Sequence, residues 1–213
     1  MKGVFDWFQG KQVERTIDAL KKNRMPAVFF RTKEQAKKGI LEMISPDSNV
    51  GIGGSVTLGQ LGLIEEMKKH GFTVLNPFEP KLTKEEKINL RRKALLSDVF
   101  LVSTNAITEG GQLFNIDATG NRVGAMIFGP KKVIVVAGAN KIVKDLDEAI
   151  LKVRERTAPI NAKRLNVKTP CVHTGQCEDC ESPERICNIW VVICKKPRLT
   201  DLQVVLVGEI LGI

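Results

Sequence analysis

Four cysteines lie close together near the end of the chain, in the segment TPCVHTGQCEDCESPERICN. Cys171, Cys177, Cys180 and Cys187 fall within 17 residues, and Cys177 and Cys180 form a C-x-x-C pair. Such a pair places two sulfurs on one side of a loop, where both can reach one metal ion, and two more thiolates complete a tetrahedron. Because the segment has few apolar residues, metal–thiolate bonds could order it. We therefore predict that these four cysteines bind a metal or a metal cluster.

The spacing leaves the identity of the metal open. C-x5-C-x2-C-x6-C is neither the usual zinc-finger pattern nor the cysteine run of bacterial ferredoxins, so zinc and an iron–sulfur cluster are both compatible with it. His173 could replace one thiolate. Redox thiols and disulfides are the alternatives, although disulfides are rare in the cytoplasm. Cys194 lies in the apolar run VVICKK and is expected to be a small buried hydrophobic residue.

A glycine-rich loop, GIGGSVTLGQLG, follows a short apolar run and leads into a helical pattern. Glycines allow a ligand to approach the backbone, and hydroxyls beside a helix start suit an anion. The pattern lacks the third glycine and the acidic residue of a dinucleotide site, and it lacks the Gly-Lys-Ser/Thr of a P-loop. Thr57 with Gln60 would also serve as a capping box. The predicted ligand-binding residues of this loop are Gly53, Gly54, Ser55 and Thr57.

A second polar segment, STNAITEGGQLFNIDATGNRVGAM, lies between two apolar runs. Turns alone explain some of its glycines and asparagines. Arg122 could bind a carboxylate or a phosphate, and Glu109 could act as a general acid or base. We expect Asn105, Asn121 and Arg122 to bind the ligand and Glu109 to be catalytic.

The elements that must position these residues alternate between helical and strand-like patterns. Helices are expected over 10–24, after Thr32, from Leu58, after Thr83 and from Val143. The helices after Thr32 and Thr83 are expected to open on capping boxes. Strands are expected at 27–30, 72–75, 98–104 and 133–138, with one or two more in IWVVIC and LQVVLVGEIL. Such alternation predicts an α/β fold with a mostly parallel sheet and helices on both faces. Residues 105–122 should form short strands and turns.

The composition bounds the class of protein. The chain has 213 residues, of which 43% are hydrophobic, and a formal net charge of +9. Its Lys and Arg residues are interspersed with Asp and Glu along the chain. This pattern fits a solvated surface or the attraction of small anions better than a nucleic-acid interface. There is neither an apolar run long enough to span a membrane nor a signal peptide at the N-terminus. We expect a cytoplasmic protein with one domain over 1–213, including a cysteine-rich insertion at 168–188.

The two polar segments carry a family resemblance. GGSVTLGQLG, followed by TNAITEGGQLFNIDATGNRVGAMIFGPKKVIVVAGANKIV, resembles the LUD domain of lactate-utilisation proteins over roughly residues 10–160 and the closing LQVVLVGEILG. The resemblance implies a fold similar to the ribose-5-phosphate isomerase, glucosamine-6-phosphate deaminase and CoA-transferase group. It implies that the glycine loop binds the ligand and that Glu109 is the nearest acidic candidate. The chain lacks the D-G-A-D-E type of motif that the isomerases use.

The resemblance implies that the protein is a component of a system that oxidises lactate or a related 2-hydroxy acid. The chain would bind a small carboxylate or phosphate and an iron–sulfur cluster. Its partners would be other iron–sulfur proteins. One alternative is an enzyme acting on a phosphorylated or CoA-linked substrate. Another is a non-catalytic binding module braced by zinc. The sequence leaves open the substrate, whether the protein is an enzyme, and whether it forms a homo-oligomer.

Overall fold

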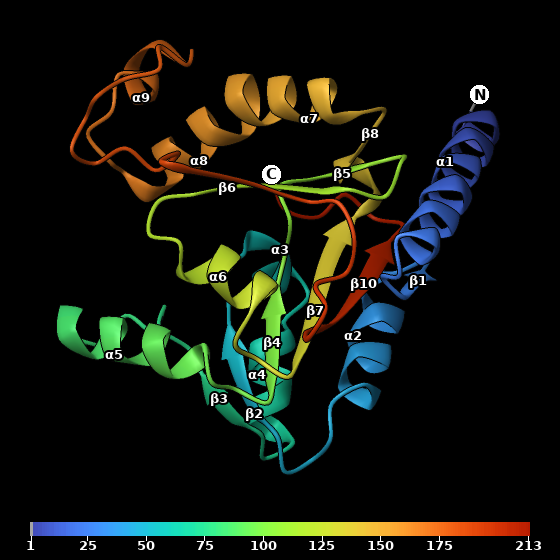
Figure 1. Cartoon of the computed structure of the whole chain (residues 1–213), viewed down its shortest axis with the longest axis horizontal. Helices are drawn as coiled ribbons and strands as arrows, with labels where there is room; N and C mark the ends of the chain where they lie inside the picture. The colour runs from blue at the N-terminus through green and yellow to red at the C-terminus, as the bar shows by residue number, and fades with distance from the viewer. Residues whose placement is uncertain (1) are drawn as a thin grey trace.

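A computed structural model describes residues 2–213 and contains a large parallel sheet (Figure 1). Its strand order is β1-β10-β7-β4-β2-β3, and every neighbouring pair is parallel. The strands are β1 (Ala27–Phe30), β2 (Asn49–Ile52), β3 (Thr73–Leu75), β4 (Val99–Val102), β7 (Lys132–Gly138) and β10 (Asp201–Val207). The α/β architecture expected from the sequence is therefore confirmed.

A smaller mixed sheet lies beside the large one, with the order β8-β5-β6-β9. Its strands are β5 (Ala106–Thr108), β6 (Leu113–Asp117), β8 (Ile142–Val143) and β9 (Ile189–Ile193). The short strands expected within 105–122 are β5 and β6. The sequence did not reveal that they join two distant segments in a sheet of their own.

Helices cover both faces of the large sheet (Figure 1). One face packs against α2 (Lys33–Glu42), α3 (Val56–Gln60) and α4 (Leu63–Lys69). The other packs against α1 (Lys2–Lys22), α5 (Lys84–Ala94), α6 (Asn121–Ile127) and the smaller sheet. Residues alternate between the faces: Leu101 contacts the first layer and Phe100 the second, as the period of two in a strand requires.

A long helical segment covers the outer face of the smaller sheet. It comprises α7 (Leu146–Lys152), a π-helical turn (Val153–Thr157) and α8 (Ala158–Leu165). Ala149, Val153 and Ala158 pack against Phe114 and Val143 beneath it. The helix expected from Val143 to Val153 thus starts later and continues further. Such π turns often occur at functional sites, because they change which side chains face inward.

The helix starts show which capping predictions hold. Thr83 accepts a hydrogen bond from the Glu86 backbone, and the Glu86 carboxylate accepts from the Thr83 backbone at 2.7 Å, which confirms this capping box. In the glycine loop, Ser55 rather than Thr57 caps α3, accepting from the Leu58 backbone at 3.3 Å. The capping alternative for Thr57 is therefore wrong, and its hydroxyl is available for another role.

The burial expected for Cys194 is wrong. This residue follows β9 and is exposed, with its sulfur 3.7 Å from the Gln112 side-chain nitrogen. The reason is that β9 pairs only with β6 at the rim of the smaller sheet, so the chain leaves the core there. Within residues 2–213, no helix combines the length and apolar character that crossing a bilayer requires.

Candidate functional site

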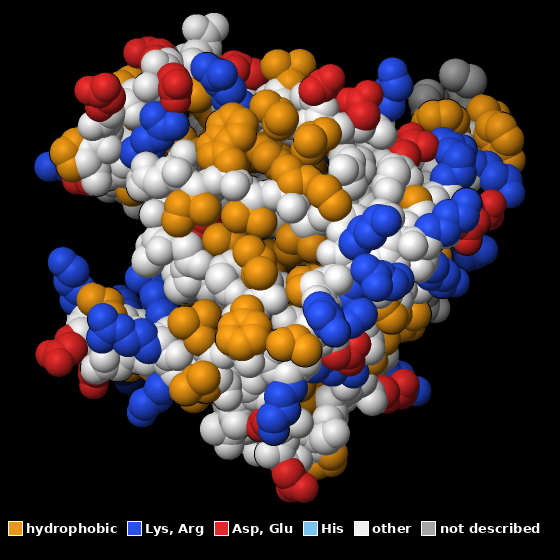
Figure 2. Space-filling model, in the orientation of Figure 1, with side chains coloured by type: hydrophobic (Ala, Val, Ile, Leu, Met, Phe, Trp, Pro, Cys, Tyr) orange, Lys and Arg blue, Asp and Glu red, His pale blue; other side chains and the backbone are white. Residues whose placement is uncertain are grey.

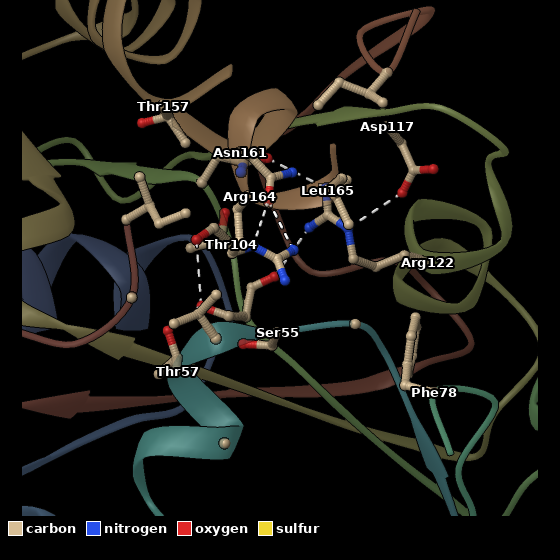
Figure 3. A pocket seen from close by; sticks show the side chains of 18 of the residues that line it. Ser55, Thr57, Phe78, Thr104, Asp117, Arg122, Thr157, Asn161, Arg164 and Leu165 are labelled. Carbon is tan, nitrogen blue, oxygen red and sulfur yellow. Dashed lines mark hydrogen bonds and ion pairs between the residues drawn. The ribbon is translucent and has the colours of Figure 1, made fainter. Parts of the chain in front are cut away.

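A cavity of about 540 Å³ lies beyond the carboxyl ends of β2 and β4. Its wall combines the loop after β2, the residues after β4, the start of α6 and one face of α8. In Figure 3, side chains of α3 and of α8 face one another across it. The outline of the molecule is indented between α5 and the segment with α8 and α9 (Figure 2). This end of the strands is where parallel α/β sheets generally bind ligands.

Lys141 is a cation in this cavity whose role the sequence reasoning did not foresee. It ends a single 3-10 turn after β7, Ala139–Lys141, and is only 5% exposed. Its Nζ donates to Ser103 Oγ at 2.9 Å, to the Thr104 carbonyl at 3.0 Å and to Thr57 Oγ1 at 3.2 Å. All three partners are neutral. Burial, reinforced by the charges of Arg122 and Lys152, lowers the pKa of Lys141 from 10.5 to about 7.

Two hydroxyls of the glycine loop are available to a ligand. Thr57 Oγ1 accepts from Lys141 and from Ser103 Oγ, while Ser55 Oγ accepts from the Leu58 backbone. Among the described residues, neither hydroxyl has a protein acceptor for its own hydrogen. Both side chains line the cavity, so both can donate to a bound anion.

Arg122 is embedded in a dense hydrogen-bond network. Its guanidinium donates to the Asp117 carboxylate at 3.1 Å, to Asn115 Oδ1 at 2.7 Å and to Asn105 Oδ1 at 3.2 Å. It also donates to the carbonyls of Ser103 at 3.0 Å and Ile116 at 2.6 Å. These bonds use the donor capacity of the guanidinium. Arg122 therefore ties β6, α6 and the end of β4 together at the cavity wall and contributes its charge to the interior.

Two further arginines make the cavity cationic. Arg91 of α5 lies over the ring of Phe78, 5.9 Å from its centroid, and its buried Nε has no hydrogen-bond partner among the described residues. Arg164 of α8 donates to Asn161 Oδ1 at 2.8 and 3.0 Å. Asp117 is the single acidic side chain among the described residues that line the cavity, and Arg122 is paired with it. A negatively charged ligand would therefore be attracted into this space.

The structure brings most of the predicted ligand-binding residues to one wall. Six of them line the cavity: Gly54, Ser55, Thr57, Asn105, Asn121 and Arg122. Gly53 lies behind the wall, where an added Cβ would meet Val102 and Phe100 of β4. Gly54 lies against the ring of Phe78, which a Cβ would meet at 2.7 Å. The glycines thus permit close packing of the loop, and the hydroxyls after them face the ligand space.

Glu109 lies outside the cavity. Its carboxylate accepts from Arg15 at 2.8 and 2.9 Å and from Gln12 at 3.1 Å, both on α1. The Arg15 hydrogen bond, opposed in part by desolvation, lowers the pKa of Glu109. Asn105 and Glu109 stand at opposite ends of β5, and a strand advances about 3.3 Å per residue. The predicted catalytic carboxylate is therefore not placed beside the predicted ligand loop.

The cysteine segment encloses a second, smaller cavity of about 20 Å³. All four predicted metal ligands line it: Cys171, Cys177, Cys180 and Cys187. Arg185 fastens the loop, donating to the Cys180 carbonyl and to the Asp179 carboxylate, each at 2.7 Å. As the side chains are placed within residues 2–213, no three metal-ligating groups converge closely enough to hold an ion. His173 is exposed and does not line this cavity.

The two cavities share part of one wall. Ala158, the first residue of α8, and Ile186 line both of them. The π turn contributes to this arrangement, because Thr157 faces the large cavity while Arg154 interacts with Cys177. The cysteine segment and the cationic cavity are therefore neighbours.

Comparison with known proteins defines the class. The LUD domain model matches residues 13–207. The chain also resembles the crystal structure of a DUF162 family protein from Deinococcus radiodurans, with a TM-score of 0.54 and 16% identity, covering 94% of this chain and 98% of that one. A weaker resemblance, with a TM-score of 0.37 and 18% identity, is to eIF2B delta from Chaetomium thermophilum, over 56% of this chain and 51% of that one. No curated protein matches the chain.

The fold and the site thus define an α/β protein with a cationic cavity at the carboxyl ends of its parallel strands. The chain belongs to the LUD domain family, and this membership supports a role related to lactate utilisation.

Proposed function

We propose that the large cavity binds a small carboxylate anion of the 2-hydroxy-acid type, as part of lactate or related 2-hydroxy-acid utilisation. The observation that carries this proposal is Lys141, a buried lysine on the cavity wall whose hydrogen-bond partners are all neutral. A buried cation without a carboxylate is costly, and a bound anion would supply the missing negative charge.

The hydroxyls beside Lys141 suit the same ligand. Ser55 and Thr57 would each donate a hydrogen bond to the carboxylate, and Lys141 would polarise the Thr57 hydroxyl that it contacts at 3.2 Å. In this proposal Arg122 acts on the ligand through its charge and by holding the wall, since its donors already have protein partners.

The experiment is calorimetry with L-lactate, comparing the wild-type chain with Thr57→Val. Loss of one hydrogen bond to a charged ligand should weaken binding by about tenfold or more. Thr16→Val is the matched control, because Thr16 is equally buried but donates to the Gln12 carbonyl on α1, outside the cavity. Unchanged affinity in Thr57→Val, or equal weakening in the control, would refute this site.

A second candidate is a larger, phosphorylated or CoA-linked substrate. A volume of about 540 Å³ exceeds what lactate needs and falls within the range of cavities for drug-sized ligands. Phe78 and Arg91 line the part of the wall near α5 and could contact such an extension. Inorganic phosphate or coenzyme A that displaces lactate, or that raises the melting temperature where lactate does not, would favour this candidate.

We further propose that the cysteine segment binds a metal centre. The donor set fits, since four thiol side chains face one cavity and thiolates are the ligands that zinc and iron–sulfur clusters prefer. The volume of about 20 Å³ has room for little more than one water-sized sphere, a size that suits a single ion. An iron–sulfur cluster would require the loop to open. When bound, zinc would brace the loop and a cluster would carry electrons.

Metal analysis and an absorption spectrum on protein purified without oxygen would distinguish these centres. Cys180→Ser should reduce the metal content, whereas Cys194→Ser, at the exposed cysteine outside the cavity, should leave it unchanged. Protein that contains neither zinc nor iron, and that takes up neither, would refute the metal proposal.

A further inference from the structure

Lys141 has the surroundings of a reactive amine as well as those of a charge. Its Nζ lies on the wall of the large cavity, in contact with the hydroxyls of Ser103 and Thr57. A hydroxyl can donate or accept, so these two partners can hold Nζ in its charged or its neutral form. A carboxylate would instead fix the ammonium form, and none of the contacts of Nζ is a carboxylate.

The packing around Nζ keeps the amine in this position. The backbone of Gly212 lies against it, so that a Cβ at Gly212 would come within 2.8 Å of Nζ. The charged groups that act on Lys141 are the cations Arg122 of α6 and Lys152 of α7. Both favour the neutral amine, and with burial they place the pKa of Lys141 at about 7. Before a ligand binds, a substantial fraction of the side chain is therefore an unprotonated amine near pH 7.

We infer that Lys141 forms an imine with the carbonyl group of a 2-oxo acid bound in this cavity. The inference rests on the proposed function in one respect, namely that the cavity accepts a small carboxylate. A 2-oxo acid has the carboxylate of a 2-hydroxy acid and carries a carbonyl in place of the neighbouring hydroxyl. Its carboxylate would lie at the hydroxyls of Ser55 and Thr57, with the carbonyl carbon toward Nζ.

The reaction balances without a further reagent. The lone pair of Nζ forms a bond to the carbonyl carbon, the nitrogen loses a proton, and the carbonyl oxygen gains one to give a carbinolamine. The carbinolamine oxygen then takes a second proton and leaves as water while the nitrogen loses its remaining proton, so that amine and ketone become imine and water. Ser103 Oγ at 2.9 Å and Thr57 Oγ1 at 3.2 Å are placed to relay these protons.

The test is reductive trapping. The protein is incubated with pyruvate and sodium cyanoborohydride, which reduces an imine much faster than a ketone, then digested and searched by mass spectrometry for a lysine carrying the reduced adduct. We expect modification at Lys141 that saturates with pyruvate and is suppressed by L-lactate, which has no ketone group. The modification should accelerate as the pH rises through about 7, where the amine loses its proton. Surface lysines should react more slowly and without saturation.

Two variants make the result specific. Lys141→Arg keeps a cation but removes the primary amine, so it should form no adduct at position 141. Lys132→Met is the matched control, since Lys132 lies at the other end of β7 and donates to the Met43 carbonyl. It should be trapped as the wild type is.

The outcomes separate the two proposals. Protein that binds pyruvate by calorimetry but yields no adduct at Lys141, or yields one no faster than at surface lysines, overturns the imine and leaves the anion site intact. Protein that binds neither pyruvate nor lactate overturns both.

Discussion

Replacing Lys141 with methionine should make the folding stability of the protein less dependent on pH. Methionine has a side chain of similar length with no charge, so Lys141→Met removes a buried titrating group and little volume. The effect follows from the pKa of Lys141, which is lowered from 10.5 to about 7 by burial and by the charges of Arg122 and Lys152.

The magnitude follows from the size of this shift. A fall from 10.5 to about 7 corresponds to about 5 kcal/mol, at about 1.4 kcal/mol for each pH unit. Between these two values the unfolded chain binds more protons at Lys141 than the folded chain, so wild-type stability should rise with pH. The loss of folding stability caused by burying a charged Lys141 is fully present below pH 7 and disappears as the pH approaches 10.5. The stability of Lys141→Met relative to the wild type should therefore fall by several kcal/mol, at most about 5, across this window.

The absolute stability of the variant includes an opposing term. Ser103, Thr57 and the Thr104 carbonyl lose their partner, and a buried polar group without a partner costs about 1–3 kcal/mol. The pH dependence of the difference is consequently the sharper measurement. Urea unfolding of both proteins at steps between about pH 6 and about pH 10 gives it. Parallel wild-type and Lys141→Met curves would show that Lys141 titrates normally, contrary to the reasoning above.

Three further predictions concern the remaining polar groups. Arg122→Met should lower the free energy of unfolding by about 3–5 kcal/mol, because it leaves Asp117 buried without its partner, and a loss below about 1 kcal/mol in urea unfolding would contradict this. Glu109→Gln should change stability by less than about 1 kcal/mol and leave lactate affinity unchanged in calorimetry, since it alters a half-exposed ion pair away from the cavity. Gly212→Ala should weaken lactate binding more than Gly71→Ala does, because both have positive φ but only the first meets Thr57 and Lys141. Equal affinities in these two glycine variants would refute the packing argument.

The elements with a strong local signal were predictable from the sequence. The capping box at Thr83 determined where α5 starts, and the apolar runs determined β1, β4 and β7. Helix α1 begins well before the expected residue 10. Its first turns extend the helix without burying an apolar face, since Val4, Trp7 and Phe8 are exposed there, so the apolar pattern gave no signal for them. The smaller sheet was missed, since its pairing of β6 with β9 depends on contacts between segments far apart in the chain.

The candidate site was predictable where the local sequence itself shapes the cavity wall, as in the loop with Ser55 and Thr57. Lys141 was missed because a lysine acquires its chemistry from burial, which one sequence does not display. One signal was present: Lys141 lies three residues after a strongly apolar strand, at the end of the sheet where ligands bind. Glu109 was predicted because a carboxylate in this polar segment could do acid–base chemistry, but β5 places it beside α1.

The position of β10 in the large sheet has a consequence for how the chain folds. Strand β10 lies between β1 and β7, so Ala27 pairs with Val204 and has no strand partner until the last part of the chain has been synthesised. Until then β1 and the edge of β7 remain open to pairing with other chains. Pairing strands so far apart in the chain slows folding. Any truncation before Asp201 would separate β1 from the rest of the large sheet, even though β1 itself is not altered.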